Sequence, residues 1–183
     1  MKSNICIMLI ISCVLFSPKI GGPVFAASND KSPTYEETLF EIGYQSVEEA
    51  LKAFEHQSKQ SLKLPVKVPP LTFTHYLGRF SNLNHSFEVK FLNDKTAENH
   101  YFIRINSTEN KLPIKEINVL NSYKLKNGNK AIYTTISGFN VLVFERDNWQ
   151  YMLNVDKRVS DKVTPQTLVE IANSINYSPK NKK

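Results

Sequence analysis

The residues that could carry chemistry are few and scattered along this 183-residue chain. Its histidines, at positions 56, 75, 85 and 100, do not follow the spacing of zinc ligands, and we expect them to be isolated and exposed. No Gly-x-Ser-x-Gly sequence offers a hydrolase nucleophile, and the glycines after residue 26 are too isolated for a phosphate-binding loop. We therefore expect no catalytic residues, no metal site and no cofactor.

Two pairs of adjacent acids, Glu36-Glu37 and Glu48-Glu49, raise the question of a glycosidase-type carboxylate pair. The first pair lies in a weakly predicted helical segment, residues 36–42, and the second lies at the start of a stronger one. Negative charge in the first turn of a helix complements the helix dipole. We therefore interpret these acids as capping residues.

Trp149 and Tyr151 are the remaining candidates for a ligand site. Aromatic rings beside a hairpin turn can form a platform for stacking sugars, but cross-strand aromatic pairs are also common in the cores of sheets. We favour the core interpretation and keep the platform as the alternative. The basic and aromatic residues near Lys90 and Arg104 do not predict a nucleic-acid partner, because Glu88 is expected to pair with Arg104.

The amino-terminal sequence has the three parts of a secretory signal. Lys2 supplies a positive charge, an apolar run spans residues 5–16, and Val24-Phe25-Ala26 provides a cleavage site before Ala27. A lipoprotein is the alternative, because Ile10-Ile11-Ser12-Cys13 loosely matches a lipid-attachment motif. In that case Cys13 would carry the lipid and attach the protein to a membrane.

Cleavage after Ala26 would leave a mature chain without cysteine, because Cys6 and Cys13 both precede this bond. It would also remove Lys2 and Lys19, and these two positive charges lower the net charge from +6 to +4. An exported protein without cysteine is more typical of Gram-positive bacteria than of animal secretion, where small domains are often held by disulfides. We therefore expect a secreted protein that is extracellular or associated with the cell envelope.

The chain contains enough apolar residues to fold, since Leu, Ile, Val and Phe make up about 30% of it, against the roughly 20% typical of disordered chains. Apolar residues at helical spacing predict helices at Val47–Lys59 and Thr164–Ile175. Ser46 and Glu49 fit a capping box before the first helix, and Pro165 suits the first turn of the second.

Between residues 72 and 155, short runs of aromatic and β-branched residues predict an antiparallel sheet. Pairing Phe87 with Ile105 makes one face of a hairpin apolar and places Glu88 opposite Arg104 on the other face. A shift of one residue would break both the apolar face and the charge pair, so we predict this register.

A second hairpin joins Val141–Glu145 to Trp149–Val155 through residues 146–148. A two-residue loop would place Phe144 opposite Tyr151. Both faces of this strand pair are apolar, which indicates a central position in the sheet.

These patterns, together with a turn at Asn127-Gly128, predict an α+β fold. We expect a curved antiparallel sheet of about five to seven strands, covered by an N-terminal and a C-terminal helix. The predicted organisation is a signal peptide (1–26), a disordered leader (27–33), a single α+β domain (34–177) and a basic tail (178–183).

The sequence resembles a known family before the sheet and in its carboxyl-terminal half. The residues concerned are Leu64-Pro65, Pro69-Pro70, Trp149, Tyr151, Leu153 and Thr164–Ile175. They resemble the Leu-Pro-x-x-x-Pro element, the Trp-containing hairpin and the Ile-Ala-x-Ser helix of an uncharacterised extracytoplasmic domain family of Gram-positive bacteria. That family occurs in secreted proteins, lipoproteins and the outer parts of membrane-bound regulators. The resemblance covers Ser46 to Ile175 and implies a fold more than a function, because the shared positions suit core or capping roles.

We expect a non-enzymatic binding or regulatory protein of the cell envelope, whose partner is an anionic envelope polymer or a secreted protein. Lysines within residues 52–67 and in the basic tail could hold such a protein at an anionic surface by charge alone. The alternatives are a small secreted hydrolase, with a site that no motif reveals, and an inhibitor of a secreted enzyme. A polar cleft with shifted pKa values would favour the enzyme, and an apolar groove or a basic patch would favour the binding protein.

The mature protein should begin at Ala27 and carry no lipid, because the apolar run continues beyond Cys13 and is unusually short before it. Mass spectrometry of the amino terminus of the protein isolated from its host measures this directly. A diacylated Cys13 at the amino terminus would show instead that the protein is anchored in a membrane.

Overall fold

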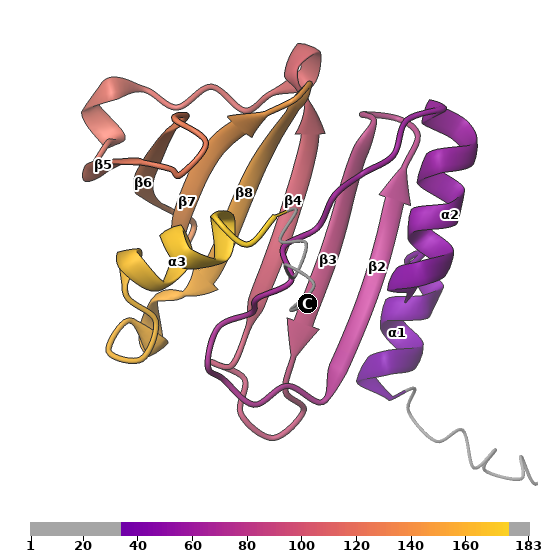
Figure 1. Cartoon of the computed structure of the whole chain (residues 1–183). Helices are drawn as coiled ribbons and strands as arrows, with labels where there is room; N and C mark the ends of the chain where they lie inside the picture. The colour runs from indigo at the N-terminus through magenta and orange to yellow at the C-terminus, as the bar shows by residue number, and fades with distance from the viewer. Residues whose placement is uncertain (1–33, 176–183) are drawn as a thin grey trace, which may run out of the picture. The chain divides into compact units, whose positions relative to one another are not determined.

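The computed structural model describes residues 34–175, which form one antiparallel sheet with three α-helices (Figure 1). The helices and strands in chain order are α1 (Tyr35–Glu41), β1 (Gln45–Ser46), α2 (Val47–Ser58), β2 (His75–Ser81), β3 (Ser86–Leu92), β4 (Tyr101–Ser107), β5 (Asn121–Lys124), β6 (Lys130–Ile136), β7 (Phe139–Arg146), β8 (Trp149–Asp156) and α3 (Pro165–Ala172). The predicted α+β class is confirmed. The predicted signal, leader and basic tail lie outside the described residues.

The order of strands in the sheet is β1-β2-β3-β4-β8-β7-β6-β5. The first four strands and the last four each follow one another as neighbours, and β8 returns to the middle to pair with β4. The sheet has eight strands, but β1 contains two residues, so seven strands of ordinary length match the expected five to seven.

The predicted registers of both hairpins are confirmed. Phe87 pairs with Ile105, and Glu88 lies opposite Arg104, between β3 and β4. Phe144 lies opposite Tyr151 in the hairpin of β7 and β8, and all residues of β8 are buried, as expected for a central strand.

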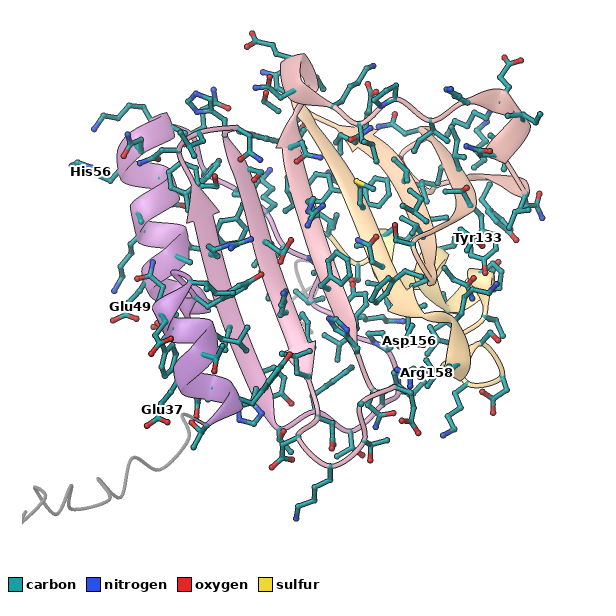
Figure 2. The ribbon with its side chains drawn as sticks, turned by 180° about the vertical axis from the view of Figure 1, so that it is seen from behind. Glu37, Glu49, His56, Tyr133, Asp156 and Arg158 are labelled. Carbon is teal, nitrogen blue, oxygen red and sulfur yellow. The ribbon has the colours of Figure 1, made fainter. Side chains whose placement is uncertain are left out.

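Glu37 and Glu49 are capping residues, as predicted, and Glu36 and Glu48 lie beside them in the first turns of α1 and α2. Glu37 accepts a hydrogen bond from the backbone N–H of Thr34, and Ser46 and Glu49 form the same reciprocal capping box at α2. Figure 2 shows the labelled Glu37 and Glu49 on the helices, outside the strands of the sheet. The two acid pairs therefore do not form a common carboxylate site.

Helix α2 packs closely on β2 because residue 78 is a glycine. A Cβ atom at Gly78 would lie 2.8 Å from Cβ of Ala50 and 2.9 Å from Cα of Val47, closer than real Cβ contacts. The helix ends at Ser58, and the next residue, Lys59, caps it with a φ of 54°, which lies in the left-handed region. The predicted helix over residues 47–59 is therefore confirmed to within one residue.

Helix α3 is shorter than predicted and ends at Ala172 instead of Ile175. Beyond this point Ile175 forms a β-bridge with Pro65, and the hydroxyl of Ser174 accepts a hydrogen bond from the N–H of Lys67. These contacts hold Ser174 and Ile175 outside the helix. They also fix the proline-rich segment before β2 against the end of α3.

The hydrophobic core lies between one face of the sheet and helices α2 and α3. We call this face the covered face, and one cluster joins its side chains to Phe54 of α2 and Leu168 of α3. Trp149 packs edge-on against Phe54, with ring centroids 5.2 Å apart. Burial of Trp149, expected from the sequence, is confirmed, since 7% of its surface is exposed.

The opposite face, which we call the second face, is polar in its middle and apolar at its two sides. At one side Leu39 of α1 packs with Leu77 and Leu92. At the other side Ile114, in the 108–120 segment between β4 and β5, packs against Val143 and its neighbours on β7 and β8. The second face is therefore covered at both sides and left open between them.

Replacing Trp149 with Ala should lower the free energy of unfolding by about 3–5 kcal/mol, because the change leaves a cavity beside Phe54. Urea denaturation measures this loss. Leu83→Ala is the control, because Leu83 is 99% exposed and its removal should leave stability nearly unchanged. Equal stability of Trp149→Ala and wild type would contradict the core assignment.

Candidate functional site

A groove of about 590 Å³ lies in the open middle of the second face. Strands β2, β3 and β4 form its floor, and Figure 2 views the sheet from this side. Ile42 and Gly43, which follow α1, line one wall, and residues 110–113 of the 108–120 segment line the other.

The floor of the groove contains two rows of side chains that the strand register aligns. Arg79, Glu88 and Arg104 form a charged row across β2, β3 and β4. Neighbouring strands are about 4.8 Å apart, so the two arginines flank Glu88 with their Cα atoms about 10 Å apart. The second row, which is uncharged, consists of Ser81, Ser86 and Asn106.

Glu88 is the centre of the charged row and is 5% exposed. Its Oε2 accepts hydrogen bonds from Nε and Nη2 of Arg104 at 3.0 and 2.7 Å. Nζ of Lys90 lies 3.6 Å from Oε1, which also accepts a hydrogen bond from the hydroxyl of Tyr44. Three partners therefore compensate the burial of this carboxylate.

Tyr44 connects the wall of the groove to its floor. It is 3% exposed and follows α1, so its hydrogen bond to Glu88 ties the α1–β1 connection to the sheet. The guanidinium of Arg79 and the ammonium of Lys90 lie 4.6 and 4.7 Å from the centre of its ring. Both distances are within the range of cation–π attraction.

The local charges set the ionisation of this cluster. Burial alone would raise the pKa of Glu88, but hydrogen bonds from Tyr44 and Arg104 and the charges of Arg104 and Lys90 outweigh it and lower the pKa. Burial, reinforced by the Glu88 carboxylate, raises the pKa of Tyr44 well above its usual value. At neutral pH the carboxylate is therefore ionised and the tyrosine is neutral.

Positive charge is in excess at the groove. Three cations, Arg79, Lys90 and Arg104, surround the single carboxylate of Glu88. Within residues 34–175 Arg79 forms no ion pair, and its Nη1 donates a long hydrogen bond of 3.4 Å to the carbonyl of Ile42. The groove can therefore attract and hold an anion.

The wall formed by residues 110–113 is fixed to the sheet by Gln150 of β8. Its Oε1 accepts a hydrogen bond from the N–H of Leu112 at 2.8 Å, and its Nε2 donates one to the carbonyl of Leu112 at 2.9 Å. Nζ of Lys111 lies 2.7 Å from Oε1 of Glu145, which neutralises this lysine. This wall is therefore anchored and adds little net charge to the groove.

The groove is poorly equipped for acid–base catalysis. Glu88 is the carboxylic acid that lines it, both of its oxygens accept hydrogen bonds, and its pKa is lowered. A general acid at neutral pH needs a raised pKa and a proton to donate. No group of three His, Cys, Asp or Glu side chains within residues 34–175 is arranged to hold a metal ion.

The structure places Trp149 and Tyr151 on the covered face, away from the groove. Tyr151 is 1% exposed, stacks on Phe144 at 5.2 Å, and donates a hydrogen bond to the carbonyl of Lys63. Burial raises the pKa of Tyr151 to about 12. Rings that are covered in this way support the core interpretation over a stacking platform. Cys13, Ala26 and Ala27 lie outside the described residues.

The expectation of exposed histidines is wrong for two of the four. His56 and His85 are exposed, but His75 and His100 are partly buried. His100 packs against Phe102 and Phe139, and burial lowers its pKa. The packing arises because His100 directly precedes β4, so its ring lies beside Phe102 of β4 and Phe139 of β7.

Sequence reasoning found the Glu88–Arg104 pair but missed Tyr44 and Arg79. The alternation of residues in His75–Ser81 was the available signal, since Leu77 and Arg79 point to the same face. Pairing this strand with β3 would have placed Arg79 next to Glu88. Tyr44 carries no comparable signal, because it lies in a short connection between elements.

Comparison with known proteins finds no matching family model, no similar curated protein and no similar solved structure. No helix in the part of the chain that the structure describes is long and apolar enough to cross a membrane. The geometry of the groove is therefore the main support for a functional proposal.

Replacing Glu88 with Gln should lower the free energy of unfolding at pH 7 by about 1–3 kcal/mol, because Arg104 and Lys90 lose their charged partner. The pKa of Glu88 is lowered by folding, so its stabilisation is complete above the unfolded pKa of about 4.3 and is lost as the pH falls through the folded pKa.

Chemical denaturation between pH 3 and pH 7 tests this dependence. The stability difference between wild type and Glu88→Gln should be constant above about pH 5.5 and should shrink below about pH 4.5. Glu55→Gln is the matched control, because Glu55 is exposed on α2 and forms no ion pair within residues 34–175. A difference that persists unchanged at pH 3 would contradict the ionised network.

Proposed function

We propose that this chain is an exported, non-enzymatic binding protein of the bacterial cell envelope and that its groove binds an anionic ligand. The observation that carries the proposal is the charge balance of the groove. Glu88 already has three partners, whereas Arg79 faces the same groove without a carboxylate partner within residues 34–175. An anion entering the groove would supply that partner.

Export is supported by the sequence. The first 26 residues have the pattern of a cleaved signal, and no cysteine follows them. The resemblance to an extracytoplasmic family of Gram-positive bacteria agrees with this location. A net positive charge in the mature chain also suits a protein that acts at an anionic envelope.

The groove gives less support to the alternatives from the sequence. A hydrolase would need a nucleophile or a proton donor in the groove, and the engaged, ionised Glu88 suits neither role. An inhibitor of a secreted enzyme would need a protruding segment or a docking surface, and the groove is concave. A bound small group or a thin polymer chain fits this shape better.

Arg79→Gln should lower the fraction of protein bound to purified envelopes about tenfold or more, because the groove loses its unpaired cation. Lys52→Gln removes the same charge from the exposed side of α2 and is the matched control. Sedimentation of envelopes at low salt measures the bound fraction, and thermal melting verifies that both variants are folded. Binding of wild type should weaken near 1 M salt, where the Debye length falls to about 3 Å.

Equal losses in Arg79→Gln and Lys52→Gln would show that dispersed lysines hold the protein, and the groove would then have no special role. Absence of wild-type binding at low salt would remove the envelope itself from the proposal. Binding of wild type that resists 1 M salt would contradict attraction by charge.

A further inference from the structure

The two arginines of the groove keep hydrogen-bond donors for a ligand. Arg104 uses Nε and Nη2 for Glu88, which leaves the Nη1 donors, and 47% of its side chain is exposed. Arg79 donates through Nη1 to Ile42 and rests on Tyr44, which leaves Nε and Nη2 without a partner within residues 34–175. These contacts hold both side chains in place and leave the other N–H donors available to a ligand.

Two guanidinium groups on either side of one carboxylate favour a tetrahedral anion. A phosphodiester shares one negative charge between two non-bridging oxygens that point in different directions, so each arginine can bind one of them. The two oxygens of a carboxylate lie in one plane, so a carboxylate bound by the fork of one arginine turns both oxygens towards that arginine and away from the second. The positions of Arg79 and Arg104 in one row therefore suit a phosphate group better than a carboxylate.

The uncharged row continues the floor next to the charged row. Ser81, Ser86 and Asn106 lie two residues along their strands from Arg79, Glu88 and Arg104, which is a distance of about 7 Å. The hydroxyl of Ser86 donates to Asn84 and can still accept, and the hydroxyl of Ser81 has no partner within residues 34–175. This row offers hydrogen bonds to neutral hydroxyl groups beside the phosphate.

We infer that the groove binds a polyol phosphate chain, in which phosphodiester groups alternate with hydroxylated carbons. Arg79 and Arg104 bind the phosphate, and Ser81, Ser86 and Asn106 bind the hydroxyl groups next to it. A groove that is open to solvent allows such a chain to continue on both sides of the bound unit. This inference names the ligand class of the proposed function and therefore rests on it.

Calorimetric titration of the mature protein at low salt tests the inference with three probes: a short glycerol phosphate oligomer, inorganic phosphate and a polyglutamate of equal charge. The oligomer should bind at least tenfold more tightly than either of the others. Arg79→Gln should weaken binding of the oligomer tenfold or more. Ser81→Ala should weaken it several-fold without changing the binding of inorganic phosphate, and Ser122→Ala, on the exposed edge strand β5, should change neither.

The outcomes separate this inference from the proposed function. Equal binding of polyglutamate and the oligomer, both weakened by Arg79→Gln, would overturn the phosphate inference and leave an anion-binding groove. Inorganic phosphate that binds as tightly as the oligomer would overturn the polymer part and indicate a site for free phosphate. Oligomer binding that is unchanged in folded Arg79→Gln would overturn both the inference and the proposed groove.

Discussion

Burial of the Glu88 carboxylate is the constraint on which the second face of this protein depends. A charge placed in the middle of a sheet face is costly unless other groups compensate it. The compensation comes from three separate segments: Tyr44 after α1, Lys90 on the same strand, and Arg104 on β4. The same set of contacts therefore holds α1 against the sheet, supports the register of β3 and β4, and places an excess of positive charge at the groove.

The two faces of the sheet were not equally predictable from the sequence. The hairpins are local, so alternation of apolar residues was sufficient to pair Phe87 with Ile105 and Phe144 with Tyr151. The contacts that close the second face join residues far apart in the chain. Gln150 holds Leu112 across 38 positions, and Tyr44 reaches Glu88 across 44. Periodicity carries no information on such pairings.

The sequence of β2 explains why Arg79 was not predicted to be part of the groove. Its covered face contains a glycine at position 78, because α2 approaches too closely for any side chain there. Without an apolar residue at its centre, the strand shows only a weak alternating pattern, so the sequence signal for its pairing with β3 is faint. Arg79 was therefore not assigned to a site from the sequence, and the structure shows that it lies opposite Glu88.

The incomplete cover of the second face follows from the same charges. A helix lying across Arg79 and Arg104 would remove water from two guanidinium groups without supplying carboxylates, a cost that packing would have to offset. The chain instead covers the apolar sides with α1 and the 108–120 segment and leaves the cationic middle in contact with solvent. Water can be replaced there by a ligand that brings its own negative charge. The positive charges that raise the free energy of burying this face therefore also make it suitable for binding an anion.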